Sequence, residues 1–305
     1  MANVTDRQER LVEVDRNVHL WVESAGDPDA PPLLLIMGAN ASGLTWPDDL
    51  VARLAAHHRV LRYDHRDTGR SSACFVERPY PITTLARDAL AVLDAYGIDQ
   101  AHVVGMSLGG TLTQLLMLDA PERLLSATLL GTSALEADPA AEGAADLPGP
   151  SEEVMAMWQH LADRRDREAD IAWHVEHWRV LAGAAAGGAF DVDEFRALED
   201  RIRRHAGRDQ QTTAHALADQ SGLGRGAELP VVRVPTLVIE APLDPVVPPP
   251  HARHLATRIP GARLVTIPAM GHALPLAVLE QVADAIVSFT SGPLPRDRNL
   301  PAVGG

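Results

Sequence analysis

The sequence has 305 residues, of which 46% are hydrophobic and 22% are charged, and its formal net charge is −14 at pH 7. This length suffices for one α/β domain with an insertion or for two small domains. The acidic balance and the lack of any basic run argue against nucleic acids and anionic membranes as partners. The single cysteine, Cys74, excludes an intrachain disulfide, and we interpret it as an ordinary loop thiol.

The apolar runs of the chain are short. The first ten residues are polar and lack the apolar stretch of a signal peptide. The run at residues 33–37 is only as long as a strand and does not approach the length that spans a membrane. We therefore expect a cytoplasmic protein.

The first part of the chain alternates strands and helices. Residues 11–14 and 18–22 alternate apolar and polar side chains, which is typical of an antiparallel hairpin at a sheet edge. The fully apolar run 33–37 suits the centre of a parallel sheet, and a helix at 48–56 separates it from a strand at 59–63. This order predicts an α/β fold with a mostly parallel central sheet flanked by helices.

A glycine-containing loop, residues 38–43, follows the apolar strand. In hydrolases with this order of elements, the corresponding loop supplies a backbone N–H to an oxyanion hole. Most such enzymes have His-Gly here, whereas this chain has Met37-Gly38. Because the donor is a backbone amide, the change of side chain need not matter, and the N–H of Ala39 is the candidate donor.

A dense polar segment, residues 64–71, follows the next strand. It has neither a glycine-rich phosphate cradle with a lysine nor a spaced set of His and Cys ligands. We therefore interpret it as a scaffold of turns and salt bridges beside the active site, rather than as a metal or phosphate site.

The Gly-x-Ser-x-Gly segment at residues 105–109 has the features of a nucleophile elbow. Residues 101–104 form a short apolar run typical of a buried strand, and residues 111–118 have apolar side chains at helical spacing. A serine at the tip of so sharp a turn has strained backbone, and the two glycines let the strand and the helix approach without a Cβ clash. The hydroxyl of Ser107 then projects above the sheet edge, where the helix N-terminus favours a developing oxyanion.

The composition changes between residues 133 and 226, where strand-like runs disappear and alanine and charge increase. A flexible linker and three helices are predicted there, at residues 138–150, 151–162, 170–181 and 191–205. We interpret residues 133–226 as a helical cap inserted into a core formed by residues 1–132 and 227–290. Residues 291–305 are rich in proline and glycine and predict a flexible tail.

Several side chains of this cap suit a pocket for an aromatic substrate. Together with a methionine beside the predicted nucleophile, these candidates are Met106, Met155, Trp158, Trp173, His174, His177 and Trp178. For each cap residue taken singly, packing inside the cap is an equally good interpretation. His174 and His177 could share a helix face and bind a metal, but no third ligand follows at helical spacing, so we expect no metal.

Two more polar residues follow predicted strands near the C-terminus. Asp244 follows a strand at 232–239, and His272 follows the last strand, 262–267. Ser107, Asp244 and His272 therefore all lie after parallel strands, where open α/β sheets place their sites. The chain order of serine, acid and histidine is that of the α/β hydrolases.

These three residues suit the roles of a catalytic triad. A serine hydroxyl is a weak nucleophile, so His272 would take its proton, and Asp244 would orient the imidazole. Three other histidines compete for the role of the base, and we interpret them as structural: His65, His102 and His251.

Six segments carry a resemblance to a known family: residues 34–38, 45–48, 62–71, 101–107, 178–181 and 268–275. Over nearly its whole length the chain resembles the α/β-hydrolase superfamily. Within it, the chain is similar to the aclacinomycin methylesterase family of anthracycline-tailoring esterases, which shares the Met-Gly pair. The resemblance implies a triad of Ser107, Asp244 and His272, and an oxyanion hole formed by the amides of Ala39 and Leu108.

The sequence thus predicts a carboxylic ester hydrolase without a cofactor. Its expected partner is a small-molecule ester, the methyl ester of a bulky aromatic polyketide, and the sequence does not set the oligomeric state. The same triad could instead hydrolyse a lactone or a C–C bond, or perform perhydrolysis. A ligand receptor built on a hydrolase fold, without turnover, is the alternative from another class.

Overall fold

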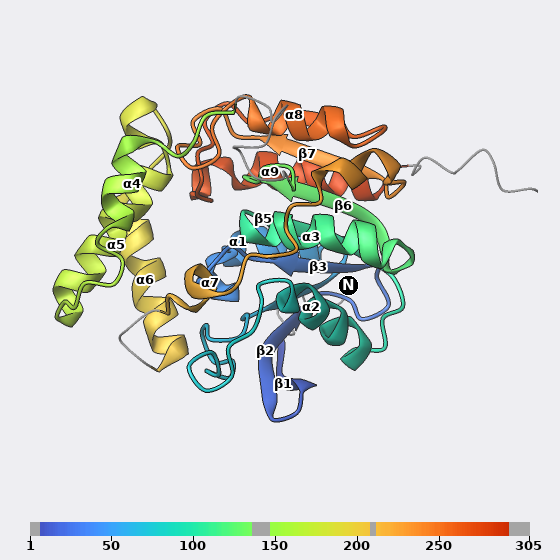
Figure 1. Ribbon diagram of the computed structural model, residues 1–305, viewed down its shortest axis with the longest axis horizontal. Coiled ribbons are helices and arrows are strands. Elements are labelled where there is room, and N and C mark those ends of the chain that lie inside the picture. The colour runs from blue at the N-terminus through green and yellow to red at the C-terminus, as the bar shows by residue number, and fades with distance from the viewer. Residues whose placement is uncertain (1–6, 136–146, 208–211, 293–305) are drawn as a thin grey trace, which may run out of the picture.

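The centre of the structure is an eight-stranded sheet (Figure 1). The computed structural model describes residues 7–135, 147–207 and 212–292. In chain order the strands are β1 (Gln8–Asp15), β2 (Val18–Ala25), β3 (Pro32–Ile36), β4 (Arg59–Tyr63), β5 (Ala101–Met106), β6 (Leu124–Leu130), β7 (Thr236–Glu240) and β8 (Arg263–Thr266). Their order across the sheet is β1-β2-β4-β3-β5-β6-β7-β8.

Most of the strands in this sheet run parallel. β2 pairs antiparallel with β1 and with β4, and every other neighbouring pair is parallel. The predicted hairpin therefore lies at one edge of the sheet, and the predicted mostly parallel α/β sheet is confirmed.

Helices cover both faces of the sheet, because apolar side chains alternate along the central strands. In β3, Leu34 and Ile36 belong to one apolar layer and Leu33 and Leu35 to the other, and all four are fully buried. The first layer includes α2 (Thr84–Ala95), α3 (Leu108–Asp119) and α8 (His251–Arg258), and the second includes α1 (Asp48–Ala55) and α9 (Leu276–Thr290). Each fully buried leucine of this kind stabilises the fold by about 1.5–3 kcal/mol.

Between β6 and β7 the chain forms a helical region, described over residues 147–207 and 212–231 (Figure 1). Its helices are α4 (Glu152–Trp158), α5 (Arg167–Leu181), the 3-10 turn Ala184–Ala186, α6 (Val192–Ala206), α7 (Ala214–Leu217) and the 3-10 helix Gly226–Val231. α5 begins three residues before its predicted start, because the side chain of Asp166 accepts the N–H of Ala169 at 2.9 Å and caps the helix there. The assignment of residues 133–226 to a separate cap stays a prediction.

Some predicted boundaries differ from those of the structure. The helix predicted at 151–162 ends at Trp158, and the strand predicted at 232–239 begins only at Thr236, after Pro235, which has no N–H to offer a neighbouring strand. The predicted linker up to residue 146 and the predicted tail from residue 293 lie outside the described residues. No helix in the described ranges is both long and apolar enough to cross a membrane.

α6 is anchored to the sheet by a buried carboxylate at the end of β4. Asp64 accepts hydrogen bonds from the Ser42 hydroxyl at 2.6 Å, from the N–H groups of Gly43 and Arg70 at 2.7 and 2.8 Å, and from Nε2 of His205 in α6 at 2.7 Å. Burial alone would raise the pKa of Asp64, but these donors, with His205 first, hold it below its usual 3.8. The segment around Asp64 therefore forms turns and an ion pair, which is the kind of scaffold that the sequence predicts.

Replacement of this carboxylate tests the anchor. Asp64→Asn is expected to lower the free energy of unfolding by about 3 kcal/mol, since it breaks a buried, fully hydrogen-bonded pair. Because the native pKa of Asp64 is depressed, its contribution is complete above its ordinary pKa and is lost as the pH falls through the native pKa. Urea unfolding from pH 7 downward should show the difference between the wild type and Asp64→Asn shrinking only below about pH 4.

The matched control is Asp29→Asn, which changes an exposed carboxylate. It should leave the free energy of unfolding unchanged within about 0.5 kcal/mol. Equal losses in the two variants would contradict the anchoring role of Asp64.

Candidate active site

Ser107 lies in the sharp turn between β5 and α3. Its backbone has a positive φ, which is strained for a residue with a side chain: φ is +54° and ψ is −122°. A Cβ at Gly105 would collide with the carbonyl oxygen of Gly109, and a Cβ at Gly109 would collide with that of Ile36. The N–H of Ser107 donates to the carbonyl oxygen of Leu130 at 2.9 Å. Neighbouring strands and the lack of side chains at both glycines therefore hold the strained serine in place.

Asp244 and His272 form a buried pair beyond β7 and β8. Nδ1 of His272 lies 2.7 Å from Oδ2 of Asp244, and the other carboxylate oxygen accepts the N–H groups of Val246 and Val247, each at 2.8 Å. Burial alone would raise the pKa of Asp244, but His272 and these two N–H groups lower it below its usual 3.8. An ionised carboxylate accepts only, so Nδ1 of His272 carries a proton and Nε2 is left for a reacting group.

Gly131, directly after β6, packs against this pair. A Cβ at Gly131 would lie 3.2 Å from Nδ1 of His272 and 3.3 Å from Oδ2 of Asp244, and its φ of +53° also favours glycine. Sequence reasoning did not single out this residue, although a glycine at the end of a buried strand is a signal for a close approach.

Gly38 places the loop after β3 next to the serine. A Cβ at Gly38 would lie 3.7 Å from Oγ of Ser107. We call residues 37–40 the Ala39 loop. The N–H groups of Ala39 and of Leu108, the first residue of α3, have no hydrogen-bond partner within the described residues. Both candidate oxyanion donors are thus available near Ser107.

The end of α5 contacts the two loops that carry the acid and the histidine. The N–H of His272 donates to the carbonyl oxygen of Leu181 at 2.6 Å. A Cβ at Gly271 would lie 2.7 Å from the same oxygen, and a Cβ at Gly183 would collide with the carbonyl oxygen of Leu243. The helical region therefore fixes the backbone of His272 directly.

Ser107 and His272 share no hydrogen bond in the described part of the chain. Bonds between a nucleophile and its base often become short only in the substrate complex. The other histidines that compete for the role of the base have partners elsewhere. Nδ1 of His102 is 2.7 Å from Oγ of Ser126. His251 is 2.8 Å from the carbonyl oxygen of Pro148.

Two of the predicted pocket residues are hydrogen-bonded to each other. The indole N–H of Trp158 donates to Nε2 of His177 at 3.2 Å. The pKa of His177 is lowered to about 4 by burial and by its neighbours His174 and His272, so its ring is neutral. Trp158 of α4 and His177 of α5 therefore form an uncharged aromatic pair.

The remaining predicted pocket residues occupy other surroundings. Trp173 packs on the guanidinium of Arg165, 4.4 Å from the ring centre, and Nδ1 of His174 lies 2.8 Å from the carbonyl oxygen of Asp170. Met155 is 46% exposed on α4, and Met106 is buried in the second apolar layer. Trp173 also packs against the rings of His174 and His177, with ring centres 4.9 and 5.2 Å apart, so these three residues of α5 form one aromatic cluster.

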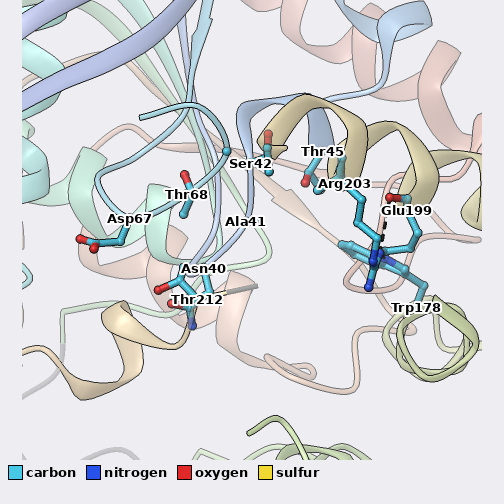
Figure 2. A pocket seen from close by; sticks show the side chains of 13 residues that line it. Asn40, Ala41, Ser42, Thr45, Asp67, Thr68, Trp178, Glu199, Arg203 and Thr212 are labelled. Atoms are coloured by element: carbon cyan, nitrogen blue, oxygen red, sulfur yellow. Dashed lines mark hydrogen bonds and ion pairs between the residues drawn. The ribbon is translucent and has the colours of Figure 1, made fainter. Parts of the chain in front are cut away.

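A pocket lies between the Ala39 loop and α5 and α6 (Figure 2). Trp178 forms one side of it, and Asn40, Thr68 and Thr212 lie on the other. The indole N–H of Trp178 donates to Glu199 at 2.6 Å, and Glu199 is also paired with Arg203. Sequence reasoning missed Glu199 and Arg203, whose spacing of four residues on one helix face was the available signal.

Among the described residues, no group of three or more His, Cys, Asp or Glu side chains is arranged to hold a metal ion. A sequence model of the alpha/beta hydrolase fold matches residues 31–276. The chain belongs to the α/β hydrolase family.

Two curated relatives are similar to this hydrolase over almost their whole length. Rhodomycin D methylesterase DnrP of Streptomyces peucetius is 50% identical in an alignment 293 residues long, which covers 92% of this chain and 97% of the relative. Rhodomycin D methylesterase DauP of Streptomyces sp. (strain C5) is 49% identical with the same coverage. The solved structure of a hydrolase from Pseudomonas aeruginosa is 29% identical, with a TM-score of 0.70, and covers 95% of this chain and all of its own.

The buried pair and the elbow make a direct prediction for the hydrolase. Ser107→Ala and His272→Ala should each lower the turnover of a short-chain nitrophenyl ester by about 10⁴–10⁶, because the parts of a triad act as a unit. Asp244→Asn should lower it by about 10⁴, since an amide can donate to the imidazole and so favour the wrong tautomer.

The release of nitrophenol, followed by absorbance, measures these effects, and the exposed His57→Ala is the control with unchanged turnover. Near-normal activity in Asp244→Asn would mean that another carboxylate orients the base.

Proposed function

We propose that this α/β hydrolase is a carboxylic ester hydrolase that cleaves the methyl ester of an anthracycline-type aromatic polyketide to the acid and methanol. The observation that carries the proposal is the 50% identity to rhodomycin D methylesterase DnrP over 92% of this chain. The family model, which matches residues 31–276, spans Ser107, Asp244 and His272.

The proposed reaction begins at the hydroxyl of Ser107. Nε2 of His272 takes the proton while Oγ attacks the ester carbonyl, and the resulting oxyanion accepts the N–H groups of Ala39 and Leu108. Methoxide is a poor leaving group, so His272 returns the proton and methanol departs, leaving an acyl group on the serine. Water then repeats the sequence and releases the acid, while Asp244 stabilises the imidazolium in both halves.

The small leaving group indicates which part of the substrate needs a pocket. Methanol occupies little space, so the surfaces of the helical region would serve the acyl group. Trp158 and His177, which are hydrogen-bonded to each other, and Trp178 in the pocket of Figure 2 offer flat apolar area with a few polar atoms. Such a surface suits a fused aromatic acyl group.

Oxygen labelling tests the proposed chemistry. In H₂¹⁸O, an anthracycline methyl ester should give equal amounts of acid and methanol, with one ¹⁸O in the acid per turnover and none in the methanol. This result follows from cleavage between the acyl carbon and the methoxy oxygen through an acyl-enzyme. Mass spectrometry of both products measures it, with Ser107→Ala as the control. The absence of methanol from an otherwise folded protein would overturn the proposed function.

Comparison of substrates tests the role of the helical region. The hydrolase should prefer a methyl ester on a fused aromatic scaffold to an aliphatic methyl ester by about 10²-fold in kcat/KM, a difference of about 3 kcal/mol. The double variant Trp158→Leu, Trp178→Leu should lose this preference and keep most of its turnover of nitrophenyl acetate. Val192→Ala, which changes an exposed side chain at the start of α6, is the matched control. Equal rates for both esters in the wild type would show that these tryptophans only pack the helical region.

A further inference from the structure

One end of the Ala39 loop is held by a buried histidine. His65, two residues after β4, is fully buried, and its Nε2 lies 2.9 Å from the carbonyl oxygen of Met37. A carbonyl oxygen only accepts, so Nε2 carries the proton and donates it. Burial lowers the pKa of His65 to about 3, which keeps the ring neutral. The peptide between Met37 and Gly38 is therefore fixed by an imidazole.

The other end of the same loop is held by a second buried histidine, from the helical region. The N–H of Asn40 donates to Nδ1 of His215 in α7 at 2.8 Å, and the N–H of His215 donates to Oδ1 of Asn40 at 3.0 Å. Because Nδ1 accepts, Nε2 must carry the proton, and it donates to the carbonyl oxygen of Arg66 at 3.0 Å. This reciprocal pair holds Asn40 in a left-handed conformation, with φ of +57°.

The two imidazoles also contact each other. Their ring centres are 5.5 Å apart with an angle of 87° between the planes, which is an edge-to-face contact. Burial lowers the pKa of His215 as well. The carboxylates of Asp67 near His215 and of Asp64 near His65 act in the opposite direction, but burial is the larger effect for both rings. The phenol of Tyr63 packs on His65 with ring centres 5.1 Å apart. Both rings are thus held neutral, each with one defined tautomer.

These contacts lie on both sides of the candidate oxyanion donor along the chain. The N–H of Ala39 belongs to the peptide that joins Gly38 to Ala39. His65 fixes the peptide before it through Met37, and His215 fixes the peptide after it through Asn40. Gly38 has no side chain that would restrict its backbone, so these neighbours are what limits rotation of the donor.

We propose that His65 and His215 are positioning residues that aim the Ala39 N–H at the oxyanion by holding the peptides on either side of it. The proposal rests on the ester hydrolysis proposed above. Through His215, the helical region contributes to the stabilisation of the transition state as well as to the substrate pocket. A donor misplaced by about 1 Å is sufficient to lower the rate by about 10²-fold.

Paired substitutions separate this role from a purely structural one. In His215→Asn the amide oxygen replaces Nδ1 as the acceptor for Asn40, whereas in His215→Gln the amide replaces Nε2 and the acceptor is lost. For His65 the pairing is reversed: Gln keeps a donor to Met37, and Asn does not reach it. We expect His215→Gln and His65→Asn to lower kcat by about 10–100-fold with KM changed less than about twofold. His215→Asn and His65→Gln should stay within about threefold of the wild type.

The assay is hydrolysis of nitrophenyl acetate, which needs the oxyanion hole whatever the natural acyl group is. A second readout is affinity for a boronic acid, which forms a tetrahedral adduct on Ser107 and should weaken in parallel with kcat. Urea unfolding reports the stability of each variant. His58→Gln is the matched control: His58 is a buried histidine at the amino end of β4, bonded to Leu54 and Thr290, so its loss should lower stability and leave kcat unchanged.

The outcomes separate the two proposals. A wild type that turns over neither nitrophenyl acetate nor the anthracycline methyl ester overturns the proposed function and the positioning role with it. An active wild type in which the Asn and Gln variants of each histidine have equal kcat overturns the positioning role alone. The same holds if kcat falls while the affinity for the boronic acid is unchanged.

Discussion

The close approach of α3 to the ends of β3 and β5 is the constraint on which the site depends. The start of the helix contacts the backbone so tightly that a Cβ at Gly105 or Gly109 would collide with a carbonyl oxygen. This approach forces Ser107 into a conformation with positive φ and lifts its side chain away from the sheet. It also brings the Ala39 loop, which leaves β3, next to the serine. The close approach of α3 to the two strands therefore exposes the Ser107 hydroxyl and places both candidate oxyanion donors near it.

The helical region contacts the candidate active site at two places, and the same region forms one side of the pocket in Figure 2. The end of α5 accepts the N–H of His272 through Leu181, and α7 holds Asn40 through His215. A shift of this region would move the base and an oxyanion donor together.

The parts of the fold and site that depend on local patterns could be predicted from the sequence. Alternating or fully apolar runs identified the strands, and the glycine spacing around Ser107 identified the turn. The contact between Asn40 and His215 joins residues 175 apart in the chain, and no local pattern indicates it. The aromatic side chains of α5 illustrate another limit. Trp173 and Trp178 are five positions apart, so they point in different directions around the helix, and only packing decides which one faces the pocket.

The charges buried in the helical region give Trp178 its orientation. Glu199 is fully buried and accepts the indole N–H of Trp178, while Arg203 bridges Glu199 to Asp170 at 2.6 Å. Buried ion pairs contribute little net stability, because the loss of hydration offsets their attraction, and well-packed apolar side chains would stabilise the helices as well. The hydrogen bond instead fixes the direction of the indole N–H, and stacking on Phe195, with ring centres 5.7 Å apart, fixes the plane of the ring. The ring then presents a defined flat face to the pocket, which is what recognition of a rigid aromatic acyl group requires.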